Sequence, residues 1–175
     1  RHMVRLGPFD GKPQPTPEAQ KERLIECRWD ACHTLEVPKD WLSGVYLGKL
    51  TATRHRYQSY VIFIVKDDRK ADFLFQCSDN TWQAYNVWPD NYSLYINDRE
   101  DKRPLVSGVR ASFVRPYARY SQILDFPLSQ GSGEFLLWEF PLAFWMEQQG
   151  YDVSYVSNAD VAADPGEVQR TKGFL

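Results

Sequence analysis

The chain has 175 residues, of which 43% are hydrophobic, and a formal net charge of −2. This length and apolar content suit about one domain with a buried core. The near balance of charge and the lack of a Lys/Arg stripe argue against a nucleic-acid-binding protein. No apolar run approaches the roughly 18 residues of a membrane span. We therefore expect a soluble, cytoplasmic protein without nucleic-acid or membrane partners.

Residues 1–34 form a Pro- and Gly-rich arm, which we expect to be extended because Pro removes backbone donors and Gly adds conformational freedom. Residues 35–68 are β-rich. Two segments in this region, GVYLGKL (44–50) and YQSYVIFIV (57–65), predict antiparallel strands joined by a short loop.

Residues 69–175 predict the first part of an α/β domain. The segment 71–75 reads as a short buried strand, and the polar residues 78–81 offer N-cap side chains for an aromatic helix that follows. Ligands of open α/β sheets gather where strands end and helices begin, so we expect residues 77–85 to face a cleft. An aromatic insertion spans 89–132 and contains a strand-like stretch, ASFVRPYARY.

A helical pattern covers residues 134–149, in which Pro141 either kinks the helix or begins it, and Gly150 follows its end. Residues 151–156 predict a second buried strand, parallel to the first through a right-handed crossover. Asn158 and Asp160 come after this strand at the edge of the cleft, where a turn is the simplest interpretation.

The last residues predict another helix and another strand. Asp164, Pro165 and Glu167 supply the N-cap, first-turn proline and N3 carboxylate of a helix. A third strand begins at Phe174 and is cut off after two residues. An unfinished strand leaves a sheet edge open, so we expect the chain to be a fragment of a longer protein.

Several separated stretches together resemble one known family. They are WLSGVYLGKL, YVIFIVKDD, ADFLFQCSDNTWQAYNVW, SLY, SFVRPY and FLLWEFPLAFWMEQQGYDVSYVSNAD. In this order they are similar to the C-terminal part of the large (beta) subunit of N,N-dimethylformamidase and its relatives, over residues 40–175. The resemblance implies a β-sandwich portion followed by a three-layer, parallel-sheet domain similar to class I glutamine amidotransferases.

The resemblance also implies hydrolysis of a small amide at a ferric iron held by two tyrosines and a glutamate. Matched by motif, the tyrosines are Tyr85 in AYNVW and Tyr117 in RPY. The glutamate belongs to a GH-x-E-Y-W motif expected after the strand that begins at Phe174. The sequence ends before that motif, so we expect the isolated chain to be inactive. Phenolate and carboxylate are hard oxygen donors that suit ferric iron.

The histidines and two of the three cysteines offer no better metal site. His2, His33 and His55 lie far from both tyrosines in sequence and do not match the missing motif. Cys27, Cys32 and His33 resemble half of a zinc site, but no second pair of ligands follows at the required spacing. With only three cysteines, a reducing compartment is favoured over a disulfide scaffold.

The candidate site residues also have structural interpretations. Tyr85 and Tyr117 could pack as aromatic side chains with hydrogen-bonded hydroxyl groups. Cys77 lies between a strand and a helix, where a helix N-terminus would lower its thiol pKa, but it lacks a G-x-C-x-G pattern. Asn80 and Thr81 are candidates for orienting substrate or water, and capping explains them equally well.

Three functions follow from these residues. The favoured one is an iron-dependent hydrolase of a small amide. The alternatives are a thiol hydrolase that uses Cys77 and a non-catalytic assembly module that binds sister subunits. The expected protein partners are a second copy of the chain, the missing C-terminal part, or a small subunit.

Overall fold

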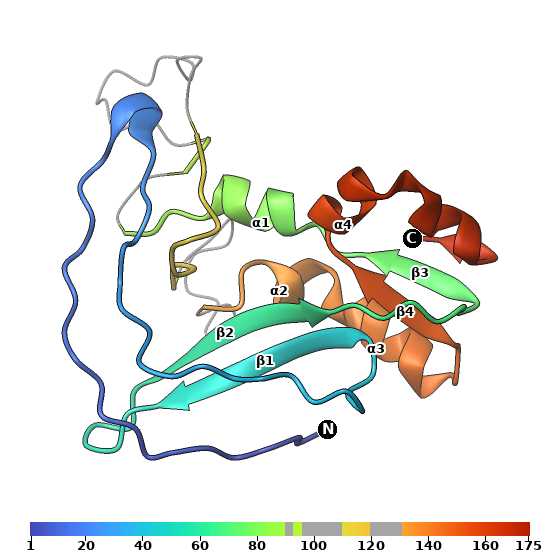
Figure 1. The fold of residues 1–175 in the computed structure, drawn as a ribbon, viewed down its shortest axis with the longest axis horizontal. Coiled ribbons are helices and arrows are strands. Elements are labelled where there is room, and N and C mark those ends of the chain that lie inside the picture. The colour runs from blue at the N-terminus through green and yellow to red at the C-terminus, as the bar shows by residue number, and fades with distance from the viewer. Residues whose placement is uncertain (90–92, 96–109, 120–130) are drawn as a thin grey trace.

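Two sheets form the framework of the molecule in a computed structural model, which describes residues 1–89, 93–95, 110–119 and 131–175 (Figure 1). Strands β1 (Gly44–Thr51) and β2 (Gln58–Val65) form an antiparallel hairpin. Strands β3 (Phe73–Gln76), β4 (Val153–Val156) and β5 (Gly173–Phe174) form a parallel sheet in the order β4-β3-β5. The predicted mixed α/β class, the hairpin and the parallel pair of strands are confirmed.

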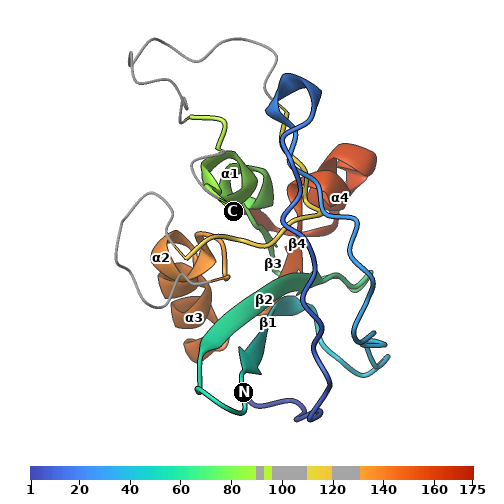
Figure 2. The same cartoon turned by 90° about the vertical axis from the view of Figure 1, so that its left-hand side faces the viewer.

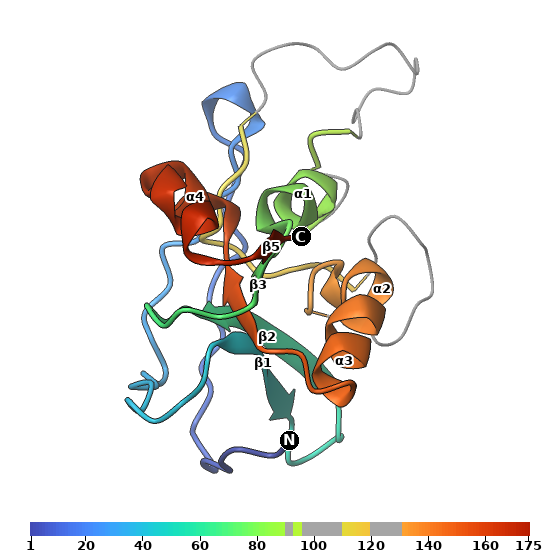
Figure 3. The same ribbon diagram turned by 90° about the vertical axis from the view of Figure 1, so that its right-hand side faces the viewer.

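All the helices except the first 3₁₀ helix, which belongs to the N-terminal arm, lie around the parallel sheet (Figure 1). The helices are α1 (Asp79–Tyr85), α2 (Phe135–Trp138), α3 (Phe140–Gln148), α4 (Asn158–Ala163) and two 3₁₀ helices, η1 (Lys21–Arg23) and η3 (Pro165–Arg170). Figure 3 shows α4 on one side of the parallel sheet and the α2–α3 pair on the other. In the described part of the chain, no helix has both the length and the apolar character needed to cross a membrane.

Proline and glycine set the bounds of α3, as the sequence predicts. Pro141 lies in the first turn, where its missing N–H costs no hydrogen bond, so it begins the regular helix instead of kinking a longer one. Gly150 follows the last turn with a φ of +79°, a conformation that glycine adopts without strain.

Three local expectations were wrong. Asn158 and Asp160 belong to helix α4, because Ser157 and Asp160 form a capping box in which each side chain accepts from the other's backbone N–H. Ser78 occupies the N-cap position of α1 but makes no side-chain capping bond. Residues 111–119 of the strand-like stretch form no strand. The last residue of that stretch and the rest of the predicted insertion lie outside the described residues, at 90–92, 96–109 and 120–130.

The hairpin packs onto the parallel sheet and shares its core. Val45, Ile62 and Ile64 lie against a buried cluster formed by β3, β4, α1 and α3, which includes Phe75, Cys77, Trp82, Ala143, Met146 and Tyr155. Ser43, just before β1, accepts a hydrogen bond at 2.7 Å from the backbone N–H of Tyr155 in β4. These contacts join the two sheets.

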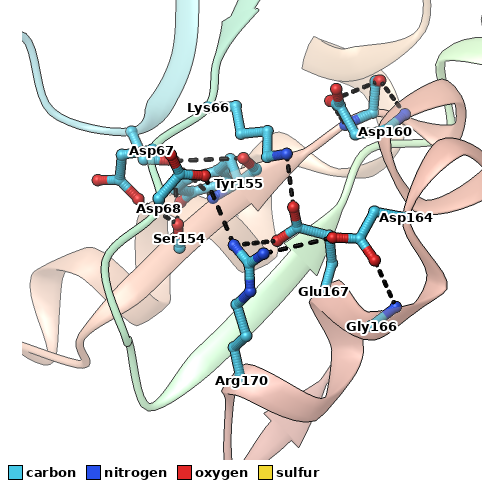
Figure 4. A network of polar contacts seen from close by, with 12 residues as sticks. Lys66, Asp67, Asp68, Ser154, Tyr155, Asp160, Asp164, Gly166, Glu167 and Arg170 are labelled. Carbon is cyan, nitrogen blue, oxygen red and sulfur yellow. Dashed lines mark hydrogen bonds and ion pairs between the residues drawn. The ribbon is translucent and has the colours of Figure 1, made fainter.

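A polar network holds the segment between the sheets against η3 (Figure 4). The buried carboxylate of Glu167 lies 2.5 Å from Lys66 Nζ and 3.2 Å from Arg170 Nη1. Arg170 also approaches Asp68 and Asp164. Ion pairs therefore link the segment after β2 to η3.

The N-terminal arm has no described helix or strand apart from η1, and it docks on the segment 110–114 (Figure 2). The backbone N–H of Cys27 donates to Val114 O at 2.7 Å, and Ser112 Oγ donates to Glu26 Oε2 at 2.9 Å. Ile25 is only 2% exposed. The arm is thus part of the packed structure over these residues.

Candidate active site

A pocket opens beyond the carboxyl end of β3, where the sequence predicts a cleft. Its volume is about 250 Å³. Residues that follow β3 line one side of it, and residues at α2 and the start of α3 line the other. The lining residues are Ser78, Thr81, Trp82, Glu134, Trp138 and Glu139.

Of the predicted substrate-orienting residues, only Thr81 lines this pocket. Asn80 is exposed, and its backbone N–H donates to Asn158 Oδ1 at 3.0 Å. The neighbouring carboxylate of Asp79 accepts from the backbone N–H of Asn158 at 2.7 Å. Asn80 and Asp79 therefore join α1 to α4.

Asn86 brings together the two segments that carry the predicted metal ligands. Its side-chain amide donates to Pro116 O at 2.9 Å and accepts from the backbone N–H of Ala118 at 2.9 Å. Asn86 follows Tyr85, and Pro116 and Ala118 flank Tyr117. The AYN and RPY motifs are therefore hydrogen-bonded to each other although they lie about 30 residues apart.

Arg115, the first residue of the RPY motif, makes the second connection. Its buried guanidinium donates to the backbone oxygens of Gln83, Asn86 and Trp88 at 3.1, 3.2 and 2.8 Å. Gln83 O, in the last turn of α1, also accepts from the backbone N–H of Asn86 at 3.3 Å, whereas the oxygens of Asn86 and Trp88 lie beyond the helix, where carbonyls have no intrahelical partner. Arg115 satisfies them and fixes the end of α1 against the RPY segment.

The two tyrosines lie in different surroundings. Tyr85 is partly buried, and its ring centroid lies 4.4 Å from that of Tyr95. Tyr117 packs on the core beside Trp82, with ring centroids 6.5 Å apart. Burial raises the pKa of the Tyr117 hydroxyl, and the carboxylates of Asp79 and Glu139 raise it further, whereas a hydrogen bond with Gln83 lowers it.

The donor atoms near Tyr117 fit a hard cation. The charges of Asp79 and Glu139 raise the pKa of its hydroxyl and that of Arg115 lowers it, so the hydroxyl keeps its proton near neutral pH and a bound cation would be needed to favour the phenolate. In the described ranges, no three His, Cys, Asp or Glu side chains group closely enough to hold a metal.

Cys77 is a core residue in this structure. Its side chain is fully buried in the cluster with Phe75 and Trp82. Burial raises the pKa of its thiol, and the charges of Glu139 and Asp79 raise it further, so the nucleophilic thiolate is disfavoured. These surroundings give no support to the thiol hydrolase.

Glu139 is a site residue that sequence reasoning missed. Its Oε1 accepts from the backbone N–H of Ser78 at 3.1 Å and from Trp82 Nε1 at 2.8 Å. Burial raises the pKa of its carboxyl, and these hydrogen bonds oppose the shift. The sequence pattern that could have indicated its role is a single carboxylate between Trp138 and Phe140 in an otherwise apolar stretch.

The fold and the pocket define an α/β protein with a candidate ligand site at the carboxyl end of a parallel strand, the usual position in this class. The chain belongs to the family described as N,N-dimethylformamidase beta subunit-like, C-terminal, whose model matches residues 1–175. No curated protein matches the chain. Family membership suggests a dimethylformamidase-like subunit, broadly a hydrolase, with a metal cofactor in the full protein, and the words "beta subunit" imply association with other subunits.

Proposed function

We propose that this chain is part of an iron-dependent hydrolase of a small amide, in which Tyr85 and Tyr117 are metal ligands. The observation that carries the proposal is the pair of hydrogen bonds between the Asn86 side chain and the residues on either side of Tyr117, one donated to Pro116 O and one accepted from Ala118 N, at 2.9 Å each. They join the residues next to both tyrosines. A chain that used these tyrosines only for packing would not require this direct link between the two motifs.

The proposed ligand set needs a third residue. A third ligand, a glutamate in a GH-x-E-Y-W motif, would follow β5. Because β5 lies next to β3 in the parallel sheet, a residue after its carboxyl end would lie at the same edge as the pocket. We expect the isolated chain, with two phenolic ligands, to bind iron weakly and to be inactive.

The iron would act as a Lewis acid toward the amide carbonyl and would lower the pKa of a bound water. The residues of this chain would supply the surroundings of that reaction. Tyr117 would hold its oxygen in a partly buried position beside Trp82, and Thr81 would offer a hydroxyl group in the pocket that Trp82 also lines. Cys77 would have only a packing role.

The proposal predicts that iron binding depends on both tyrosines. Iron content and visible absorption are measured for this chain and for a version extended beyond Leu175 through the expected motif. We expect the extended protein to hold iron and to show phenolate-to-iron absorption. Tyr85→Phe and Tyr117→Phe should each lower iron affinity at least about tenfold, because each removes one ligand oxygen.

Tyr57→Phe is the matched control, because Tyr57 is 75% exposed and lies in the loop before β2. It should retain the iron content and the absorption of the unmodified protein. A folded, iron-supplemented extended protein that stays metal-free would refute the proposal, as would Phe variants that bind iron as well as the control.

We also propose the division into an arm (1–34), a β-rich region (35–68) and an incomplete α/β domain (69–175) related to class I glutamine amidotransferases. The separate antiparallel and parallel sheets support it. The shared core and the contacts of Lys66 and Asp68 with η3 imply that these parts fold as one unit.

A second proposed role is subunit association through the outer face of α2 and α3. Residues 140–146 of α3 are all apolar, so this part of the helix has no polar side, which is typical of a helix that is covered on both faces. The large apolar side chains exposed there are Trp138, Phe140, Leu142, Phe144 and Trp145. An apolar surface of this kind indicates a protein interface, and the family description makes another subunit the proposed partner.

This role predicts that Trp145→Glu dissociates the assembly of the intact protein, because a carboxylate would be buried without a partner. Sedimentation velocity of the variant should show a smaller particle than the unmodified protein. Gln148→Glu, at an exposed residue in the same helix, adds a carboxylate outside the apolar face and should leave the assembly intact. Identical sedimentation of Trp145→Glu and the unmodified protein would exclude this face as an interface.

A further inference from the structure

The side chain of Gln83 lies at the centre of the contacts that join the AYN and RPY motifs. Gln83 belongs to the last turn of α1 and is only 3% exposed. Its Oε1 atom accepts from Arg115 Nε at 3.3 Å and from Asn86 Nδ2 at 3.2 Å. Its backbone oxygen accepts from Arg115 Nη2 at 3.1 Å. One residue of each motif therefore holds this buried amide in place.

These contacts fix which end of the Gln83 amide carries the oxygen. A guanidinium can only donate hydrogen bonds, so the atom that faces Arg115 Nε must be an acceptor. Asn86 Nδ2 also donates to Pro116 O, a carbonyl oxygen that can only accept, which identifies the Asn86 nitrogen in the same way. The oxygen of Gln83 is thus directed at Arg115 and Asn86, and its other end, Nε2, is a hydrogen-bond donor.

The donor end of Gln83 interacts with the hydroxyl group of Tyr117. The hydrogen bond between these two side chains lowers the pKa of the hydroxyl, which is the effect of an N–H group donated to the phenol oxygen. The backbone on either side of Tyr117 is held as well, because Pro116 O and Ala118 N are both hydrogen-bonded to the Asn86 side chain. The end of α1 and Asn86 therefore hold Tyr117 at its backbone and at its oxygen.

We propose that Gln83 is a positioning residue for the iron ligand Tyr117, in which Gln83 Nε2 donates to the phenolate oxygen that binds the metal. The inference rests on the proposed function and adds a residue that acts on the iron through its ligand. A phenolate oxygen has enough lone pairs to accept a hydrogen bond and bind a metal at once. Partners of this kind orient metal ligands, and their loss weakens metal binding about ten- to a hundredfold.

The contact itself is tested without iron, by the NMR signals of the Gln83 side-chain amide in this chain. Tyr117→Phe removes the acceptor oxygen and keeps the ring, so it should shift these signals and speed the exchange of their protons with water. Tyr57→Phe, at the exposed tyrosine before β2, should leave them unchanged. Amide signals that do not respond to Tyr117→Phe would overturn the inference.

The effect on the ligand is tested in the extended protein loaded with iron. Gln83→Met has a similar length and no N–H group, so iron affinity should fall at least about tenfold. The phenolate-to-iron absorption should also move to longer wavelength, because a phenolate without this hydrogen bond gives up its electrons more easily. Gln83→Glu keeps an oxygen for Arg115 and Asn86 but loses the donor, so it should shift the absorption in the same direction.

Ser112→Ala separates this effect from a general loosening of the RPY segment. Ser112 Oγ donates to Glu26 and accepts from the backbone N–H of Val114, so its loss weakens the attachment of the segment and leaves the Gln83 amide in the chain. This variant should unfold at a lower temperature and keep the absorption wavelength of the unmodified protein.

The outcomes distinguish this inference from the proposed function. An absorption that stays in place in both Gln83 variants, or that shifts equally in Ser112→Ala, would overturn the positioning role and leave the iron proposal standing. An extended protein that binds no iron would refute the iron proposal and the positioning role together, even if the amide signals show the contact with Tyr117.

Discussion

Replacing Arg115 by lysine should lower the free energy of unfolding by about 2 to 4 kcal/mol, even though the positive charge is kept. The guanidinium of Arg115 is a planar group that donates to Gln83 O, Asn86 O and Trp88 O at the same time. A lysine ammonium is a single point that cannot reach all three oxygens. At least one buried carbonyl would lose its donor, and the end of α1 would loosen from the RPY segment.

Urea unfolding followed by circular dichroism measures this loss. The matched control is Arg110→Lys in the same segment, because the Arg110 side chain is 67% exposed and, within the described residues, its ion pair is a 3.5 Å contact with Glu22. Surface ion pairs contribute little, so the control should change stability by less than about 0.5 kcal/mol. Equal stabilities for the two variants would show that the guanidinium geometry is not needed.

The elements that sequence could predict are those fixed by local chemistry. The hairpin follows from two runs of β-branched and aromatic residues, and the pairing of Gly44 with Val65 and of Thr51 with Gln58 agrees with their spacing. Helix α3 follows from its apolar content with Pro141 at one end and Gly150 at the other. Each signal lies within the element that it predicts.

The features that the sequence did not predict depend on contacts between residues far apart in the chain or on sequence patterns of only a few residues. Helix α4 has six residues and no apolar periodicity, and only the Ser157–Asp160 capping box marks it. The roles of Asn86 and Arg115 depend on partners about 30 residues away. The pocket around Glu139 exists only because α2 and α3 pack beside α1, which no local pattern specifies.

Gly131→Ala should be the most destabilising small substitution in the described chain, with a loss of about 3 to 5 kcal/mol. Gly131 has a φ of +80°, which side chains disfavour. A Cβ atom there would lie 2.2 Å from Tyr60 O and 2.7 Å from Ser59 Oγ. Because Tyr60 is in β2, the methyl group would push the chain before α2 away from the hairpin.

Gly150→Ala separates the two causes of this loss. Gly150 has a nearly identical φ of +79°, but a Cβ atom there would meet nothing within 4 Å. Its substitution should therefore cost only about 1 to 2 kcal/mol, the penalty of the left-handed backbone alone. Thermal unfolding of both variants measures the difference, which reports the contact between the hairpin and residue 131. If both variants lost the same stability, the backbone conformation would account for the whole effect, and the close approach of Tyr60 to Gly131 would be wrong.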